Sequence, residues 1–149
     1  MPTSIPISMP APTPTPANSS ITYEAEASQN TLSNGAQILS CSSCSGGYRV
    51  GALGLRTNGA DGMLRFNNVN KDVAGKYTLT LYYSNGSRSD RDLDIRINGG
   101  AAIVFTGSPT GSFTTIATAY VAVTLNAGNN TITFDNPQAV TLDIDKIII

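Results

Sequence analysis

The chain contains no histidine and no tryptophan, and only 13% of its 149 residues are charged. The absence of histidine removes the usual general base, every His-dependent catalytic triad and the commonest ligand of transition metals. With a formal net charge of −1, the chain has no basic surface suited to nucleic acid. No apolar run approaches the roughly 20 residues that cross a bilayer, so we expect neither a nucleic-acid nor a membrane partner.

The N-terminus lacks a basic segment followed by an apolar core, so the sequence predicts no signal peptide within this chain. That absence does not decide where the protein works. Lys and Glu are scarce, whereas Thr, Ser, Asn and Gly are abundant, a composition typical of extracellular β-proteins. The composition therefore favours a secreted protein.

Residues 1–20 carry six of the eight prolines, in an alternating Pro-Thr run. Such a run cannot pack a core and is expected to be extended and solvated. It is either a disordered tail or a linker between modules of a larger secreted protein, and we favour the linker. The sequence thus predicts a linker at 1–20 and one folded module at 21–149.

The module is predicted to consist of short strands separated by turns. Ten segments have the alternation and the β-branched and aromatic content of strands: 21–27, 36–41, 48–53, 62–69, 75–84, 91–97, 101–107, 120–126, 130–135 and 141–149. Turn signals such as Asn34-Gly35 and Asn98-Gly99 separate them, and no window of 11 residues shows helical periodicity. This pattern predicts a single antiparallel β-sandwich of jelly-roll type, large enough to bury a core.

Two of these strands have a clear core-facing side. The residues assigned to core packing, without any functional role, are Tyr77, Leu79, Leu81 and Tyr83 on one strand and Leu93, Ile95 and Ile97 on the next.

Pairs of acidic residues lie near both ends of the module. Glu24 and Glu26 are two residues apart, as are Asp143 and Asp145, and within a strand each pair would share a face. The ends of a domain often come close together. If the first and last strands are neighbours, up to four carboxylates converge without an evident Lys or Arg stripe, and Ca²⁺, which takes six to eight oxygen ligands, suits them better than Mg²⁺. The alternative is two acidic edges that never meet.

Cys41 and Cys44 form a Cys-x-x-Cys motif. A zinc site would need two further Cys or His ligands, and a thioredoxin-like site would need a βαβ context; the sequence has neither. The composition favours a local disulfide over two free thiols. We expect it to shape the loop that follows.

The segments YEAEA, CSSCSGGYRVG, AGKYTLTLYYSNG and LNAGNNTITF, followed by DIDKI, resemble a carbohydrate-binding module of family 35. They most resemble the modules attached to α-galactosidases and related glycoside hydrolases, which are related to family 6 modules. The resemblance runs from about Ile21 to Ile149. It implies a jelly roll with a structural Ca²⁺, held by the side chains of Glu24, Glu26 and Asp145 and by backbone carbonyls, including that of Arg49. It leaves the role of Asp143 open.

The same resemblance implies that loops at one end of the sandwich bind a sugar without hydrolysing it. Relatives often have Tyr at the position of Ala52 and Trp at the position of Phe113, so a broad stacking platform is not expected. The candidate sugar contacts are Tyr48, Asn85, Arg88, Arg91, Phe113 and Asn136.

The sequence suggests different roles for two of these candidates, Asn85 and Asn136. For Asn85, which precedes Gly86, ordinary turn chemistry is the favoured interpretation. A residue matching Asn136 contacts the sugar in related modules. We therefore expect Asn136→Ala to abolish binding and to leave the melting temperature nearly unchanged.

Three functions of different classes remain after this reasoning. The leading hypothesis is a non-catalytic, monomeric, secreted module that holds a glycoside hydrolase of the same chain near polysaccharide, with a terminal galactose-type or uronic-acid sugar as ligand. A glycosidase that uses paired carboxylates is the second. The third is a structural or adhesive sandwich without sugar binding, suggested by the absence of Trp.

Overall fold

The computed structural model describes residues 19–149, so the linker predicted at 1–20 falls almost entirely outside the described residues. Twelve strands and one short 3₁₀ turn, Ser45–Gly47, follow in chain order. The strands are β1 (Thr22–Glu24), β2 (Thr31–Ser33), β3 (Gln37–Ser40), β4 (Tyr48–Gly51), β5 (Gly54–Leu55), β6 (Asp61–Lys71), β7 (Gly75–Ser84), β8 (Arg91–Ile97), β9 (Ile103–Gly107), β10 (Ala117–Leu125), β11 (Gly128–Asp135) and β12 (Asp143–Ile148). In this part of the chain no helix is long and apolar enough to cross a membrane.

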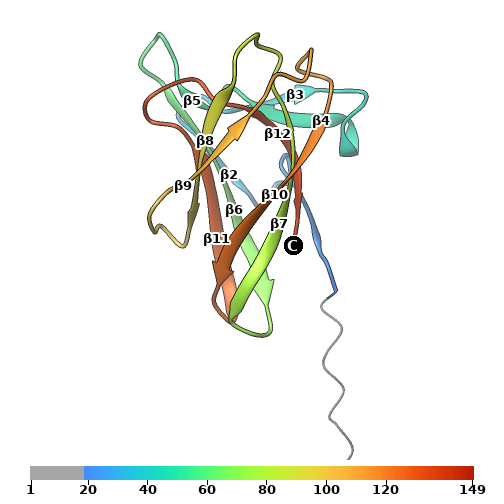
Figure 1. The fold of residues 1–149 in the computed structure, drawn as a ribbon, viewed down its shortest axis with the longest axis vertical. Helices are drawn as coiled ribbons and strands as arrows, with labels where there is room; N and C mark the ends of the chain where they lie inside the picture. The colour runs from blue at the N-terminus through green and yellow to red at the C-terminus, as the bar shows by residue number, and fades with distance from the viewer. Residues whose placement is uncertain (1–18) are drawn as a thin grey trace, which may run out of the picture.

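The strands form two antiparallel sheets that face each other (Figure 1). One sheet has the order β10-β7-β12-β4-β3, and β1 also pairs with β12. The other has the order β2-β6-β11-β8-β9, and β5 also pairs with β6. The predicted antiparallel β-sandwich is confirmed.

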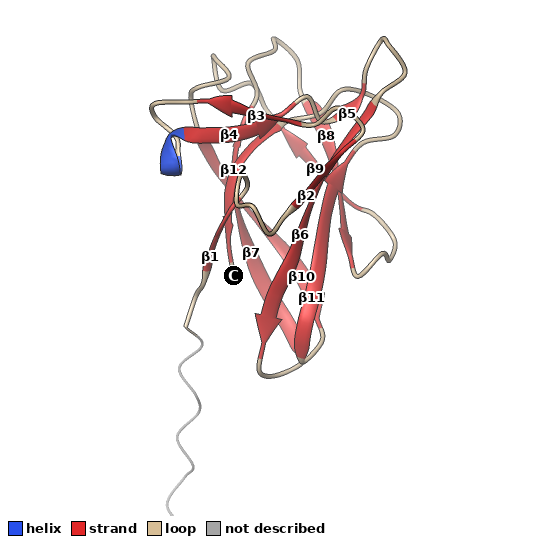
Figure 2. Cartoon of the chain, turned by 180° about the vertical axis from the view of Figure 1, so that it is seen from behind, coloured by secondary structure: helices blue, strands red, loops and turns tan. Residues whose placement is uncertain are grey.

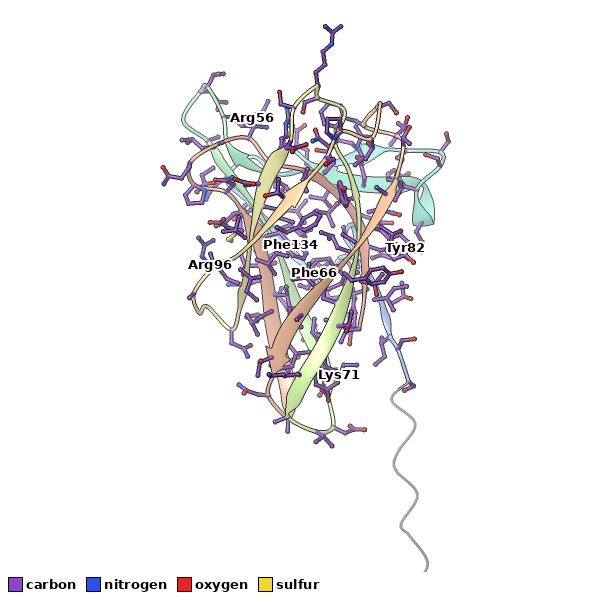
Figure 3. The ribbon with its side chains drawn as sticks, in the orientation of Figure 1. Arg56, Phe66, Lys71, Tyr82, Arg96 and Phe134 are labelled. Atoms are coloured by element: carbon purple, nitrogen blue, oxygen red, sulfur yellow. A yellow bond between two sulfur atoms is a disulfide. The ribbon has the colours of Figure 1, made fainter. Side chains whose placement is uncertain are left out.

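Alternating apolar residues from both sheets build the core. The face predicted from the sequence is confirmed, because Leu79, Leu81 and Leu93 are fully buried. Phe66 on β6 and Phe134 on β11 belong to neighbouring strands of the second sheet. Their rings meet edge to face in the core, with centroids 5.6 Å apart (Figure 3). Burial of an alternating face is what fixes the strand register, because a shift of one residue would turn every such side chain to solvent.

The predicted strands are confirmed in most places, and β7 and β8 have the predicted bounds. The structure adds β2 and β5, which are three and two residues long. Segments this short show no alternation that could identify them from the sequence. The strand predicted at 21–27 ends at Glu24, and Ala25 and Glu26 lie in a turn.

Loops from both sheets gather at the upper end of the sandwich in Figure 1. They are residues 52–53, 56–60, 85–90, 108–116 and 136–142. Backbone hydrogen bonds join them to one another and to β5: Thr110 N–H donates to Asn85 O at 2.8 Å, and Leu55 N–H to Asn136 O at 2.9 Å. The 3₁₀ turn lies beside β4, at the edge of the first sheet (Figure 2). The candidate sugar contacts other than Tyr48 lie in or next to these loops, and the candidate metal ligands lie near the 3₁₀ turn.

Candidate functional site

The first and last strands of the module are neighbours. β1 pairs with β12, with Tyr23 opposite Ile147 and Glu24 opposite Lys146. The backbone N–H of Ala25 continues this pairing by donating to the carbonyl of Asp145 at 3.0 Å. The prediction that the two acidic segments lie side by side is therefore confirmed.

A β-bulge in β12 sets the position of Asp145. Ile144 pairs with Tyr83 and Lys146 with the adjacent Tyr82, so Asp145 is an extra residue in the ladder. Bulges of this kind change the direction of a side chain, and they often occur next to functional sites. The sequence period of two gave no sign of this irregularity.

Three carboxylates surround the 3₁₀ turn. The backbone N–H of Ser45 donates to Asp145 Oδ1 at 2.9 Å, and the hydroxyl of Ser45 donates to Glu24 Oε1 at 2.7 Å. Glu26 Oε1 lies against Gly46, where a Cβ atom would collide with it. Gly46 also has a φ of 64°, a conformation that favours glycine. The turn is thus shaped to accept these carboxylates.

The turn that contains Glu26 is held by a side chain that the sequence did not indicate. Asn30 Nδ2 donates to the carbonyl of Glu24 at 2.8 Å and to that of Ala25 at 3.0 Å. Ser45, Gly46 and Asn30 are the residues that sequence reasoning missed. The Cys-x-x-Cys motif and the segment CSSCSGGYRVG pointed to Ser45 and Gly46, but they did not predict contacts with the distant acidic residues.

The acidic residues lack enough partners for their charge. Glu24 Oε2 and Glu26 Oε2 are buried without a hydrogen-bond partner. Burial, together with the charges of Glu24 and Glu26, raises the pKa of Asp145 to about 6. Burial also raises the pKa of Glu26, and the charge of Glu24 adds to this. Within residues 19–149 no group of three acidic, Cys or His side chains is arranged to hold a metal ion as it stands.

Cys41 and Cys44 are joined by a disulfide immediately before this turn. Both are buried, and the N–H of Cys44 donates to the carbonyl of Cys41 at 3.1 Å. The N–H of Gly47 in turn donates to the carbonyl of Cys44 at 3.1 Å. The disulfide loop and the 3₁₀ turn therefore form one continuous hydrogen-bonded segment that presents Ser45 to the carboxylates.

Asp143 does not join the other three carboxylates, so the predicted convergence of four is wrong. Its Oδ2 accepts from Arg49 Nε at 2.7 Å, and both side chains are largely buried. Burial raises the pKa of Asp143, while Arg49 and then Arg91 oppose that rise. The sequence did not reveal that Arg49 neutralises Asp143, because the two residues are far apart in the chain and lie on different strands.

Arg49 was expected near the acidic site through its backbone carbonyl. The structure shows the pairing of its side chain with Asp143, and it places Ser45 rather than Arg49 against the carboxylates. The role of the Arg49 carbonyl stays a prediction.

At the loop end, Arg91 and Phe113 form a stacked pair. The guanidinium carbon of Arg91 lies 5.6 Å from the centroid of the Phe113 ring. Arg91 Nη1 also donates to the carbonyl of Thr141 at 3.0 Å, which fixes the guanidinium between two loops. Arg88 is exposed in the adjacent loop. The site thus offers charged donors beside an aromatic ring.

Asn85 is buried and supports this loop end from within. Its Nδ2 donates to the carbonyls of Ser89 and Gly107, both at 2.9 Å, and its Oδ1 accepts from the N–H of Ser87 at 3.1 Å. These bonds are those of a turn-forming residue, as the favoured interpretation of Asn85 predicted.

Asn136 is also buried, and its amide is engaged in the fold. Nδ2 donates to the carbonyl of Asp92 at 2.9 Å, while Oδ1 accepts from the N–H of Gln138 at 2.9 Å and from that of Ala139 at 3.2 Å. The expectation that Asn136→Ala leaves stability unchanged therefore does not agree with its surroundings.

Tyr48, the remaining candidate, lies on β4 directly after the 3₁₀ turn and is 46% exposed. Among the described residues, no hydrogen bond or aromatic contact connects its side chain to the Arg91–Phe113 pair. Its place is beside the acidic turn rather than with the other sugar-binding candidates.

The described part of the chain is thus a β-sandwich module with loops gathered at one end and an acidic turn beside its first and last strands. The sequence profile described as carbohydrate binding module (family 35) matches residues 21–149. A family 35 module from Clostridium thermocellum is 36% identical, with 85% of this chain and 96% of that chain covered and a TM-score of 0.79. The chain belongs to carbohydrate-binding module family 35.

Longer relatives carry a similar module. The exo-beta-1,3-galactanase from Phanerochaete chrysosporium is 33% identical, with 87% of this chain and 29% of that chain covered and a TM-score of 0.78. Endo-1,4-beta-xylanase B and alpha-L-arabinofuranosidase C from Cellvibrio japonicus are each 38% identical over 76 residues, or 50% of this chain. The chain spans only 13% and 12% of these two curated relatives.

Membership of this family answers the question of catalysis. Family 35 modules bind carbohydrate and are not catalytic. The alternative of a glycosidase built on paired carboxylates is therefore wrong. The alternative of a sandwich that has lost sugar binding is decided by a binding measurement on this chain.

Proposed function

We propose that this module holds a glycoside hydrolase of the same secreted protein near its polysaccharide, by binding a terminal galactose-type or uronic-acid sugar at the loop end. The observation that carries the choice of site is the Arg91–Phe113 pair. An aromatic ring can pack against the apolar C–H face of a sugar, and a guanidinium offers several donors to its hydroxyls or carboxylate.

The targeting role is supported by the longer relatives. The galactanase, the xylanase and the arabinofuranosidase are enzymes of which the matching segment forms only a minor part. A sugar-binding module within such an enzyme raises the effective concentration of the catalytic domain at its substrate. The extracellular composition agrees with a secreted parent protein.

A structural Ca²⁺ belongs to the same proposal. The residues present fit the ion, because Glu24 and Glu26 each have a buried oxygen without a partner and Gly46 leaves room beside Glu26. Carboxylate and carbonyl oxygens are the ligands that Ca²⁺ prefers. Glu24, Glu26 and Asp145 would hold the ion, with backbone carbonyls such as that of Arg49 completing its ligands.

The arrangement of these side chains without an ion also agrees with the proposal. Asp145 and Glu24 each accept one hydrogen bond from Ser45, through Oδ1 and Oε1, while Glu24 Oε2 and Glu26 Oε2 have no partner. Mutual repulsion would keep them apart, and a bound cation would remove it. The ion would then stabilise the pairing of β1 with β12, so its role is in the fold rather than in catalysis.

A glycan array followed by calorimetry tests the sugar proposal. We expect binding of galactose-type or uronic-acid ends with an affinity weaker than roughly 10 μM, since each hydrogen bond exchanged with water contributes only about 0.5–1.5 kcal/mol. Arg91→Lys keeps the charge but loses the planar fork and should weaken binding about tenfold. Phe113→Ala should do the same.

A matched control is Arg65→Lys, which makes the same chemical change on the outer side of β6, away from the candidate sugar contacts. Full affinity in both Arg91→Lys and Phe113→Ala would exclude the loop-end site. Submicromolar binding to crystalline cellulose would contradict the proposed ligand class.

A further inference from the structure

The outer face of the first sheet carries a groove that the loop-end site does not use. The groove has a volume of about 440 Å³, and its lining includes Ser43, Ser45, Tyr82, Thr118, Asp145 and Lys146. Its polar residues come from three separated segments: the disulfide loop with its turn, β7 with β10, and β12. The groove therefore exists only in the folded sandwich.

Strand register defines the floor of this groove. Lys146, Tyr82 and Thr118 form one row across β12, β7 and β10, because Lys146 pairs with Tyr82 and Tyr82 with Thr118. Tyr82 points away from the core, since its neighbour Tyr83 is buried; in Figure 3 Tyr82 lies on the outer side of the sheet. Lys146 Nζ lies 5.0 Å from the centroid of the Tyr82 ring. The floor thus presents an ammonium donor held in place on an aromatic ring.

The next row across the sheet contains an exposed aromatic residue. Ile148, Thr80 and Tyr120 lie opposite one another on β12, β7 and β10. Tyr120 is 74% exposed, although tyrosine normally buries much of its ring. It lies two residues beyond Thr118, about 7 Å along the strand, and diagonally across from Tyr82. An open aromatic surface therefore follows directly after the polar groove.

We propose that this face is a second carbohydrate-binding surface that takes an internal stretch of a neutral polysaccharide, with the groove and Tyr120 as successive contacts. The hydroxyl of Thr118 can donate and accept hydrogen bonds to a hydroxyl-rich ligand. The hydroxyls of Ser43 and Ser45 donate to Thr114 O and Glu24 Oε1, so they offer the ligand their oxygens as acceptors. The exposed ring of Tyr120 provides the apolar surface on which a sugar face packs.

The charge and the shape of the groove favour an internal stretch of a neutral polysaccharide. With Ca²⁺ held as proposed by the three carboxylates of the acidic turn, the negative charge that remains is balanced by Lys146, so the groove attracts neither an anionic nor a cationic chain. The surface is open along the strands of β7 and β10, unlike a loop-end pocket, and so suits a continuing chain rather than a chain end. It goes beyond the proposed loop-end site, and it does not depend on the sugar bound there.

Affinity electrophoresis of the full chain in gels that contain soluble neutral galactan, xylan, glucan or mannan tests this inference. Wild type should be retarded by at least one of them. Tyr120→Ala should weaken that binding about fivefold or more, and Lys146→Ala should also weaken it. Tyr120→Phe, which keeps the ring, should bind as wild type does. Unchanged melting temperatures will show that the variants are folded.

The controls separate this surface from the loop-end site. Val104→Ala removes an exposed apolar side chain from the other sheet, where Val104 is 59% exposed, and should change nothing. Tyr120→Ala should bind monosaccharide ligands of the loop end as wild type does, whereas Phe113→Ala should bind them about tenfold more weakly.

Each other outcome has a definite meaning. Wild-type binding of a neutral polysaccharide that is unaffected by both Tyr120→Ala and Lys146→Ala would overturn the second surface alone. Binding of monosaccharides or uronates without any retention by neutral polysaccharides would do the same. No binding to any saccharide would overturn both this surface and the loop-end proposal.

Discussion

Arg49 on β4 neutralises Asp143 on β12 through a hydrogen bond of 2.7 Å from Nε to Oδ2, within a largely buried pair. The pair separates the two aspartates of the Asp-x-Asp motif into different environments: Asp143 beside arginines and Asp145 beside glutamates. It also adds a side-chain link between β4 and β12, the central strand of the first sheet.

Removal of one member of the Arg49–Asp143 pair should therefore lower the free energy of unfolding. We expect Arg49→Met to lower the free energy of unfolding by about 3 kcal/mol, because it leaves the Asp143 carboxylate buried without its closest cation. Asp143→Asn in the Arg49→Met background should recover most of the loss. Urea unfolding measures both, with the exposed Arg88→Ala as a control that should change little. A loss below about 1 kcal/mol for Arg49→Met would contradict the role of the pair.

Chelation should destabilise the module if the acidic turn binds Ca²⁺. A ligand that binds only the native state stabilises it by about 2.7 kcal/mol at one hundred times its dissociation constant. We expect excess chelator to lower the melting temperature, and we expect Glu26→Gln or Asp145→Asn to reduce that sensitivity. An unchanged melting curve together with no metal in elemental analysis would rule out the ion.

The pH dependence of stability should differ with and without the ion. Without it, the pKa of Asp145 rises from 3.8 to about 6 in the folded state, mainly through burial. The contribution that protonation of Asp145 makes to the free energy of unfolding is complete below pH 3.8 and is lost as the pH rises through about 6. This group should therefore make the chelated protein melt at a lower temperature at pH 7 than at pH 4.

Calcium affinity should change in the opposite sense, because the ion binds deprotonated carboxylates. Calorimetric titration at pH 5 and pH 7 should show tighter binding at pH 7. Asp145→Asn in chelator should flatten the pH profile of the melting temperature, and an identical profile in that variant would contradict the assignment.

Asn136→Ala should now be expected to cost stability as well as binding. The change removes three hydrogen bonds from a buried amide, and we expect a loss of about 1–3 kcal/mol in the free energy of unfolding. Thermal unfolding checks this, with the exposed Asn68→Ala as its control. A melting temperature equal to that of wild type would restore Asn136 as a residue for recognition alone.

Cys41 and Cys44 should contain no free thiol. Thiol titration of the denatured, unreduced protein made under oxidising conditions should find essentially none, and two titratable thiols would contradict the disulfide. The double variant Cys41→Ser and Cys44→Ser should lose only about 2 kcal/mol of stability, since the closed loop is short. A much larger loss would show that the disulfide supports the acidic turn beyond its effect on chain entropy.

The sequence by itself determined the fold class, most strands and the core. Alternation in segments such as 75–84 and 91–97 reports directly which side chains face the core, because burial of one face constrains every second residue. Turn signals were similarly local, and they correctly assigned Asn85 to turn chemistry. The presence of acidic residues at both ends of the module was also evident.

Only the tertiary structure decided how these residues meet. The bulge at Asp145, the approach of Ser45 and the pairing of Arg49 with Asp143 depend on strands that are far apart in the chain. No local period encodes them, since the register between distant strands is set by packing of the whole core. The groove beside Tyr82 and the exposure of Tyr120 arise for the same reason, because they exist only where β7, β10 and β12 lie side by side.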